Sequence, residues 1–292
     1  MAKVISIDCG GTNLRVAVVD ENLNIICAKR GPTVQNDGYK LYEKMKSLIL
    51  EVSATAKLTS IPSIGLSICG TVSHNAVGRC GNLGLPNGFD FESLFHKDFP
   101  DSKIKIANDG NCSALVEALY GVNKGLRDSA FVTISSGIGL GIVHNGEMID
   151  SPMEGGRVII EYQNNFYEAE YILSGNGIVR LCHMNGLEIT GGSQFFDLIR
   201  GHDPKALKIY DIWLKELGMW FANIQLLFNC QQYALSGGVM KSQEIFLKDL
   251  ERVSNAAIAS WHLNPIVLKN AHFDQDVGIA AAGCLALHEL DK

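Results

Sequence analysis

The feature that most constrains this chain is a strand, a glycine turn and a returning strand, in an order that occurs twice. Residues 3–8 form a short apolar run, residues 9–13 interrupt it with turn-forming residues, and residues 14–20 resume the apolar run. The same order returns between residues 129 and 144. Two strands joined by a short glycine turn form an antiparallel hairpin rather than a strand–helix unit. The sequence therefore predicts two halves of similar design.

Apolar spacing predicts the other main elements of both halves. Helical spacing marks residues 38–57, 112–120, 205–232 and 277–290, and short apolar runs at 64–68, 103–107 and 233–235 predict strands. Strands that alternate with helices are typical of an α/β protein. A length of 292 residues suits two domains of ordinary size.

Composition excludes several classes of function. The chain holds 30 glycines, where average usage of roughly 7% predicts about 20, and many stand in loops where backbone can approach a ligand. The net charge of -6, with no basic block, argues against nucleic-acid binding. No segment has the apolar length of a membrane span, and the first strand leaves no room for a signal peptide.

The eight cysteines are dispersed, without a C-x-C or C-x-x-C pair. Such spacing does not supply the clustered ligands of a structural zinc site. It is typical of reduced, mostly buried thiols. We therefore expect a cytoplasmic protein without structural zinc.

Five segments in order carry a resemblance to a known family. They are DCGGTNLR at 8–15, NDGN at 108–111 with Glu117 and Gly121 downstream, TISSGIGLG at 133–141, SGGV at 236–239 and DVGIAAA at 276–282. They resemble the motifs of the ROK family (repressors, open reading frames, kinases), and they span nearly the whole chain. The chain is similar to the sugar kinases of that family, of the glucokinase and N-acetylmannosamine kinase type.

The resemblance implies an α/β protein with the actin-like (RNase H-like) ATPase fold, whose two domains flank a cleft. The first domain is expected at residues 1–107, with a final helix at about 279–292 packing back on it. The second is expected at residues 108–278. ATP is expected deep in the cleft, and a homodimer is expected because dimers are common in the family.

The resemblance also assigns the ATP-binding residues. Glycine loops let backbone N–H groups approach phosphate oxygens without a side chain in the way. The assigned residues are Asp8, Gly10, Gly11, Thr12 and Asn13 in the first loop, Ser135, Ser136 and Gly137 in the second, and Gly237 and Gly238 in an adenosine loop. Asp8 is expected to hold Mg²⁺ through water, because Mg²⁺ keeps much of its hydration shell.

A sugar hydroxyl that attacks a phosphoryl group must lose its proton, and a carboxylate within hydrogen-bond reach accepts it. By the resemblance, Asp109 is this general base; the alternative is a plain helix N-cap. The expected sugar contacts are Asn82, Asn108, Gly70, Glu154, Arg157 and Glu170. For Asn82 and the glutamates, the alternative is an ordinary solvated side chain.

The chain departs from the family pattern in one region. The family carries G-E-I-G-H followed by the zinc motif C-x-C-G-x-x-G-C-x-E, whereas this chain has Glu154-Gly155-Gly156-Arg157 and lacks the zinc cysteines. Arg157 therefore stands where the family has a histidine. It can donate to the sugar, pair with Glu154 or Glu170, or point to solvent. The sugar-binding glutamate is Glu170 or, as the competing assignment, Glu168.

The expected function is ATP-dependent phosphorylation of a hexose or N-acetylhexosamine at the 6-hydroxyl. The missing zinc motif favours N-acetylmannosamine and the frequency of activities in the family favours glucose, so the sugar stays open. The alternative is a catalytically weak sugar-binding or regulatory protein. A DNA-binding repressor is disfavoured, because the first loop begins at Asp8 and leaves no room for a helix-turn-helix ahead of it.

Overall fold

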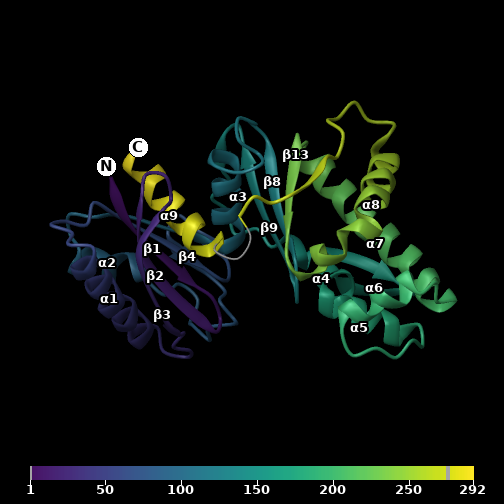
Figure 1. Ribbon diagram of the computed structural model, residues 1–292, viewed down its shortest axis with the longest axis horizontal. Coiled ribbons are helices and arrows are strands. Elements are labelled where there is room, and N and C mark those ends of the chain that lie inside the picture. The colour runs from purple at the N-terminus through teal and green to yellow at the C-terminus, as the bar shows by residue number, and fades with distance from the viewer. Residues whose placement is uncertain (1, 274–276) are drawn as a thin grey trace. The chain divides into compact units, whose positions relative to one another are not determined.

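The computed structural model of this protein describes residues 2–273 and 277–292 and divides into two compact units (Figure 1). The first comprises the described residues of Met1–Val116, Met148–Met153 and Gln275–Lys292, and the second those of Glu117–Glu147 and Glu154–Asp274. The chain first passes from one unit to the other within helix α3 (Asp109–Leu119). The domain limits expected at 107 and 278 remain a prediction.

The first unit is built on a five-stranded sheet of order β3-β2-β1-β4-β7. The strands are β1 (Lys3–Cys9), β2 (Asn13–Asp20), β3 (Ile25–Pro32), β4 (Ser63–Ile68) and β7 (Lys103–Asn108), and the helices are α1 (Gly38–Thr55), α2 (Phe91–Asp98) and α9 (Val277–Leu290). A small hairpin of β5 (Val72–Ser73) and β6 (Ala76–Val77) follows β4. Strands β1, β2 and β3 pair antiparallel, whereas β4 and β7 run parallel to β1.

Strand β1 is buried on both faces, because successive side chains point to opposite sides of a sheet. Ile5 and Ile7 belong to the hydrophobic core that also contains Leu41 of α1. On the other face, the Ser6 hydroxyl donates a 2.6 Å hydrogen bond to the carbonyl of Ile279 in α9. Helix α9 therefore covers the face of β1 on which Asp8 lies, and Figure 1 shows this yellow helix beside the purple first strand.

The second unit repeats this plan on a sheet of order β10-β9-β8-β13-β14. Its strands are β8 (Ser129–Ile134), β9 (Ile138–His144), β10 (Glu147–Met148), β13 (Gln232–Ser236) and β14 (Leu268–Asn270). Strands β8 and β9 form an antiparallel hairpin, and β13 runs parallel to β8. The repeated hairpin predicted from the sequence is therefore confirmed.

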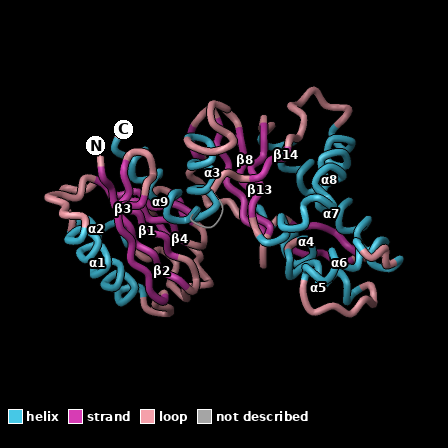
Figure 2. Tube along the Cα trace, viewed as in Figure 1, coloured by secondary structure: helices cyan, strands magenta, loops and turns pink. Residues whose placement is uncertain are grey.

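Several elements of the second unit were not predicted. They are α4 (Ala169–Leu173), α5 (Gly175–Met184), α6 (Gly192–Arg200), α8 (Gln243–Ile258), the short 3₁₀ turns η1 (Gly155–Arg157) and η2 (Gly238–Ser242), and a hairpin of β11 (Ile159–Tyr162) and β12 (Asn165–Glu168). Figure 2 shows these helices beyond the strands of the second sheet. Most of them are shorter than the windows in which apolar periodicity is distinct.

The predicted helix limits differ from the observed ones by up to four residues. Helix α7 (Pro204–Phe228) ends four residues earlier than predicted, because Asn229 adopts the left-handed conformation with φ 47° and ends the helix. Helix α3 begins at Asp109 rather than at residue 112. The last helix begins at Val277 as predicted, and Asp276 of the closing motif lies outside the described residues. Within residues 2–273 and 277–292, none of the helices has the length and apolar character needed to cross a membrane.

The contact of α9 with the sheet leads to a first prediction. A Cβ atom added at Gly65 of β4 would lie 2.1 Å from the Ala282 carbonyl oxygen and 2.9 Å from the Ala286 nitrogen. We expect Gly65→Ala to lower the free energy of unfolding by about 1–3 kcal/mol, because the methyl group displaces α9. Urea denaturation followed by circular dichroism measures the change.

The matched control is Gly81→Ala, whose added Cβ meets no atom within 4 Å. Its stability should stay within about 0.5 kcal/mol of the wild type. If both substitutions had equally small effects, the close packing of α9 on β4 would be contradicted.

Candidate active site

The residues predicted to act in function form two groups, one in each unit. The first unit holds Asp8, the loop 10–13, Gly70, Asn82, Asn108 and Asp109. The second holds Ser135, Ser136, Gly137, Glu154, Arg157, Glu170, Gly237 and Gly238. Each group is described within its own unit.

The loop between β1 and β2 is held by hydrogen bonds to its carbonyl groups. The carbonyl oxygens of residues 10, 11 and 12 accept in turn from the Thr33 hydroxyl at 2.7 Å, the Gln35 side-chain amide at 2.6 Å and the Thr33 backbone N–H at 2.9 Å. In a planar trans peptide the N–H points opposite to the carbonyl. The N–H groups of residues 11, 12 and 13 therefore point away from Thr33 and Gln35.

Successive N–H groups that point out of a glycine turn form a concave site for an anion. The geometry of this loop suits phosphate oxygens at residues 11–13, whereas the Gly10 N–H donates to the Asn13 carbonyl at 3.0 Å. The ATP contacts of residues 10–13 stay a prediction. The sequence analysis missed Thr33 and Gln35, which hold the loop in this orientation. The sequence marks these two residues only weakly, because they are ordinary polar residues between strand β3 and helix α1.

Asn82 lies beside this loop on an exposed turn. A Cβ added at Gly11 would lie 3.2 Å from the Asn82 Cβ, so the absence of a side chain there lets the two segments approach. Gln35 also donates to the Asn82 carbonyl at 3.3 Å. The predicted phosphate loop and the predicted sugar contact Asn82 are therefore neighbours.

Asp8 stands near the end of β1 and pairs with Arg15 of β2. The Arg15 Nε and Nη2 atoms lie 3.0 Å and 2.9 Å from the same carboxylate oxygen, Oδ2. Burial raises the pKa of Asp8, and the Arg15 charge opposes that rise. A Cβ added at Gly278 would lie 2.3 Å from the Asp8 carboxyl carbon, so this glycine makes room for the carboxylate. A carboxylate oxygen is a suitable ligand for Mg²⁺ or for its bound water.

Asn108 and Asp109 stand where β7 meets α3. The Asn108 Oδ1 accepts from the N–H groups of Gly110 and Asn111 at 2.8 Å and 3.3 Å, and its Nδ2 donates to the Gly70 carbonyl at 2.7 Å. Asn108 therefore caps α3 and fixes it to Gly70. Asp109, the first residue of the helix, is exposed, and its Oδ1 accepts from the Gly110 N–H at 2.8 Å. The capping role considered for Asp109 is thus filled mainly by Asn108.

Gly70 lies in a strained turn that only glycine accommodates easily. Its φ is +105°, and an added Cβ would lie 2.5 Å from the Arg79 carbonyl oxygen. Two buried cysteines lie close to the predicted acidic residues. Burial raises the pKa of the Cys112 thiol, and the negative charge of Asp109 raises it further. Burial likewise raises the pKa of Cys9. Both thiols therefore stay neutral at physiological pH and add no negative charge beside Asp8 and Asp109.

The second predicted phosphate loop, between β8 and β9, is also held by hydrogen bonds to its carbonyl groups. The Ser135 carbonyl accepts from the Gly175 N–H at 2.6 Å. The Ser136 carbonyl, at 3.0 Å, shares the single hydrogen of the Ser174 hydroxyl with the Glu170 carbonyl, at 2.6 Å. The N–H groups of Ser136 and Gly137 therefore point away from residues 174 and 175. The sequence analysis did not predict this contact of Ser174.

Gly237, predicted to contact adenosine, lies against the end of β8. It has φ +101°, and an added Cβ would lie 2.4 Å from the Ile134 carbonyl oxygen. A side chain at this position would displace the strand that leads into the second loop. Gly238 opens η2, and an added Cβ there meets nothing within 4 Å.

Arg157 lies among three carboxylates. It pairs with Glu168 in a close contact, and its Nη1 lies 3.1 Å from the Glu170 Oε1. The hydrogen bond with Glu168 raises the pKa of Arg157, and the charges of Glu170 and Glu154 raise it further. Of the alternatives considered for Arg157, pairing with glutamate is the one observed, although Glu168 joins Glu170 in the pair.

Glu170 is joined to the second loop. Its Oε2 accepts from the Ile138 N–H at 3.2 Å, and the same oxygen lies 2.7 Å from the position of a Cβ added at Gly137. The side chain of Glu170 is 25% exposed, against 44% for Glu168. Glu154 is exposed, and its carbonyl accepts from the Arg157 N–H at 3.0 Å.

Glu117 and Gly121 of the second motif have a structural role. The Glu117 carboxylate is fully buried and accepts from the N–H groups of Val122 and Phe273, each at 2.9 Å. A Cβ added at Gly121 would lie 2.0 Å from a Glu117 carboxylate oxygen. These residues therefore join the end of α3 to a segment more than 150 residues later.

The sequence pattern of the ROK family matches residues 4–289. This chain belongs to the ROK family. The beta-glucoside kinase of Listeria innocua serovar 6a is 24% identical over 96% of both chains. The N-acetylmannosamine kinase of Citrobacter koseri is 24% identical over 97% of this chain and 98% of its own length.

Among solved structures, the ROK family glucokinase from Streptomyces griseus, in complex with glucose and AMPPNP, is similar with a TM-score of 0.72. The likeness covers 98% of this chain and all of that chain, at 19% identity. The fold class predicted from the sequence, an actin-like α/β ATPase fold, is confirmed by this likeness.

The Asp8–Arg15 pair leads to a second prediction. We expect Arg15→Met to lower the free energy of unfolding at neutral pH by about 1–3 kcal/mol, because it leaves a largely buried carboxylate without its cation. Since burial raises the pKa of Asp8, ionisation of Asp8 costs stability as the pH rises through that pKa, and Arg15 reduces the cost. The difference in the free energy of unfolding between Arg15→Met and the wild type should therefore shrink in acid, where Asp8 is protonated.

Urea denaturation at about pH 7 and about pH 3, either side of the carboxyl range, measures this effect. Arg252→Met is the control, because Arg252 and Asp249 form a 3.1 Å pair that is 69% and 47% exposed. Exposed pairs contribute about 0–1 kcal/mol. Equal losses in the two variants, or a loss at Arg15 that persists in acid, would contradict the interpretation.

Proposed function

We propose that this chain transfers the γ-phosphoryl group of ATP to the 6-hydroxyl of a hexose or N-acetylhexosamine. The enzyme class predicted from the sequence, a ROK family sugar kinase, is confirmed by the family match and by the kinases among its relatives. The observation that carries the proposal for this chain is the pair of loops whose tethered carbonyls turn their N–H groups outward. Outward N–H groups at two glycine loops suit the phosphates of a nucleotide.

In the proposed reaction, the sugar O6 forms a bond to the γ-phosphorus as the bond from that phosphorus to the β-phosphate oxygen breaks. ADP leaves, and the hydroxyl proton passes to the Asp109 carboxylate. Phosphoryl transfer depends mainly on positioning and on neutralising charge. The N–H groups of residues 11–13 in the first unit, and of 136 and 137 in the second, would stabilise phosphate oxygens. Mg²⁺ held at Asp8 would supply further neutralisation.

Asp109 is suited to the role of general base by exposure and by anchoring. Its carboxylate is accessible at the first residue of α3, and Asn108 holds that end of the helix against Gly70. The base therefore stands on a fixed helix end rather than on a loose loop. Fixed geometry favours proton transfer, which requires an approach of about 2.6–3.2 Å between heavy atoms.

The proposed sugar contacts in the first unit are Asn82, Asn108 and Gly70. Asn108 uses Oδ1 for capping and one N–H for the Gly70 carbonyl, and its amide nitrogen carries a second hydrogen that can be donated to a hydroxyl. In the second unit we propose Glu170, Arg157 and Glu154. Glu170 is preferred to Glu168 because Glu170 is also tied to the second phosphate loop through Ile138.

We propose that Arg157 replaces the family's histidine by orienting carboxylates. Its guanidinium group holds Glu168 and Glu170 at once, in a region where other family members use a zinc site. The sugar is proposed to be glucose or N-acetylmannosamine, and the beta-glucoside kinase relative makes glycosides of glucose a further candidate substrate. We further propose that the protein is cytoplasmic, since a reducing compartment keeps its eight free cysteines reduced. The proposal of a homodimer rests on the frequency of dimers in the family.

Replacement of the general base is the direct test. We expect Asp109→Asn to lower kcat by about 10²- to 10⁴-fold while sugar binding persists, because the amide fills the same space but accepts no proton. Coupled ADP release with Mg-ATP against hexoses and N-acetylhexosamines measures turnover, and calorimetry measures binding.

Asp101→Asn, at an exposed carboxylate in the turn before β7, is the control and should retain full turnover. An Asp109→Asn enzyme as active as the wild type would remove Asp109 from the mechanism. A wild type that binds sugar but releases no ADP with any of them would instead support the alternative, a sugar-binding regulatory protein.

Arg157 gives a separate test of the sugar site. We expect Arg157→Gln to raise the KM for the sugar about tenfold, or about 1.4 kcal/mol, with a smaller change in kcat, because Glu170 loses its charged partner. Glu168→Gln, which removes only the more exposed member of the cluster, is the matched control and should raise KM less. Glu170→Gln is measured beside it. If Glu168→Gln raised the KM for the sugar more than Glu170→Gln did, the sugar contact would be assigned to Glu168.

A further inference from the structure

A short segment of the first unit, residues 33–36, donates hydrogen bonds both to the first glycine loop and to the turn that carries Asn82. Thr33 holds two carbonyl groups of the loop, one through its hydroxyl at 2.7 Å and one through its backbone N–H at 2.9 Å. At the other end of the segment, the Asn36 N–H donates to the Leu83 carbonyl at 2.7 Å. The proposed phosphate loop and the proposed sugar turn are therefore tied to one segment.

Gln35 is the residue of this segment whose side chain contacts both sides. Its Nε2 atom lies 2.6 Å from the Gly11 carbonyl oxygen and 3.3 Å from the Asn82 carbonyl oxygen. A side-chain amide nitrogen carries two hydrogens, so it donates one to each carbonyl. The two peptide groups therefore share one donor group, and a displacement of either changes the hydrogen bond to the other.

The two carbonyls that Gln35 holds belong to the two parts of the proposed site. The peptide group of the Gly11 carbonyl also carries the Thr12 N–H, which points away from Gln35, on the side proposed for phosphate. A phosphate oxygen that accepts from this N–H polarises the peptide group and strengthens its carbonyl as an acceptor. The Asn82 carbonyl, in turn, adjoins the Cα atom that carries the proposed sugar contact.

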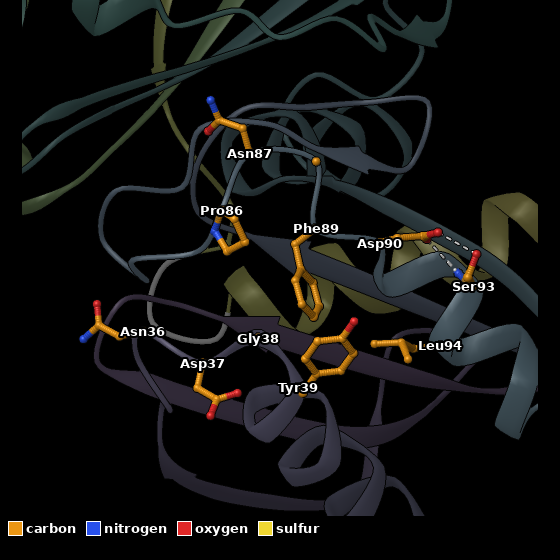
Figure 3. A pocket seen from close by; sticks show the side chains of 11 residues that line it. Asn36, Asp37, Gly38, Tyr39, Pro86, Asn87, Phe89, Asp90, Ser93 and Leu94 are labelled. Atoms are coloured by element: carbon orange, nitrogen blue, oxygen red, sulfur yellow. Dashed lines mark hydrogen bonds between the residues drawn. The ribbon is translucent and has the colours of Figure 1, made fainter.

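The turn of residues 81–88 has few packing contacts that fix its exposed part. Leu83 and Leu85 are buried, and the other residues of the turn are exposed. Its last residues border a cavity of about 590 Å³, which Asn36 also lines (Figure 3). Because an open cavity supplies no contacting atoms on that side, the hydrogen bonds from residues 35 and 36 fix the exposed part of the turn relative to the loop.

We propose that Gln35 is a positioning residue that couples nucleotide binding at the first loop to sugar binding at Asn82. The inference rests on the proposed function and gives a role in it to a residue outside the reacting groups. Phosphate at the Thr12 N–H strengthens the bond between Gln35 and the Gly11 carbonyl, and the fixed Gln35 side chain then restricts the motion of Asn82. Since coupling between two binding sites is reciprocal, sugar strengthens nucleotide binding by the same factor.

Calorimetric titration measures this coupling without turnover. Glucose, N-acetylglucosamine and N-acetylmannosamine are titrated with and without Mg²⁺ and the ATP analogue AMPPNP, and AMPPNP is titrated with and without each sugar. We expect AMPPNP to lower the Kd of a bound sugar about tenfold in the wild type. Gln35→Met keeps the length of the side chain but donates no hydrogen bond, so it should reduce this coupling factor to about threefold or less.

Thr33→Val is the matched control, because it loosens the same loop without touching Asn82. It removes the hydroxyl that holds the Gly10 carbonyl at 2.7 Å and leaves both contacts of Gln35 in place. We expect the Kd of AMPPNP to rise about threefold, with the coupling factor retained. If Thr33→Val reduced the coupling factor as much as Gln35→Met does, any loosening of the loop would suffice and the role of Gln35 would be overturned.

Hydrogen exchange gives a second measure, one that needs no sugar. Within the turn, the Leu83 and Gly84 N–H groups donate to the carbonyls of residues 80 and 81 at 3.1 Å and 3.2 Å, so their exchange reports opening of the turn. AMPPNP with Mg²⁺ should slow this exchange about threefold in the wild type and in Thr33→Val, but not in Gln35→Met. Because Gln35 is exposed, its replacement removes no core packing.

The outcomes separate this inference from the proposed function. If a sugar is phosphorylated but Gln35→Met keeps the wild-type coupling factor, or the wild type shows no coupling, the role of Gln35 is wrong and the kinase stands. If coupling depends on Gln35 but no sugar is phosphorylated, the role of Gln35 stands and the proposed reaction fails. If none of the three sugars binds, exchange decides: protection of the turn by AMPPNP that depends on Gln35 supports the inference, and its absence overturns it.

Discussion

The functional geometry of this protein depends on the planarity of the peptide group. Each of two glycine loops has its carbonyl oxygens held by donors from a later segment, Thr33 and Gln35 in one unit and Ser174 and Gly175 in the other. Since a trans peptide places its N–H opposite its carbonyl, these bonds determine where the N–H groups point. Each loop is therefore held with its N–H groups already oriented.

Strand β1 provides the second requirement, a fixed position for Asp8. Alternation along the strand sends Ile5 and Ile7 into the core beneath α1 and turns Ser6 and Asp8 toward α9. Because α9 packs closely on this face, positions that face it tolerate little added volume, and Asp8 depends on Arg15 to offset its burial. The carboxylate is thereby held near the end of β1, beside the loop of residues 10–13.

Much of the fold and the location of the candidate site could be predicted from local pattern, because strand–turn–strand units and glycine loops consist of contiguous residues. The repeated hairpins and most long helices were found where periodicity indicated them. The donors that orient the loops were not, since Thr33 and Gln35 are ordinary polar residues until β3 places them beside residues 10–12. The capping by Asn108, where Asp109 had been considered, likewise depends on how β7 enters α3.

By itself, the sequence determined the class of fold, the family and the chemical types at the site, because each depends on residues close together in the chain. Only the tertiary structure decided which partners those residues take. Arg157 joins Glu168 and Glu170 because the β11–β12 hairpin brings residues 157 and 168 together. Residues 36–39 and 86–90, about 50 residues apart in the chain, line one cavity, where Tyr39 and Phe89 pack edge to face at 5.2 Å. Such contacts depend on packing between distant segments, which periodicity and motif do not encode.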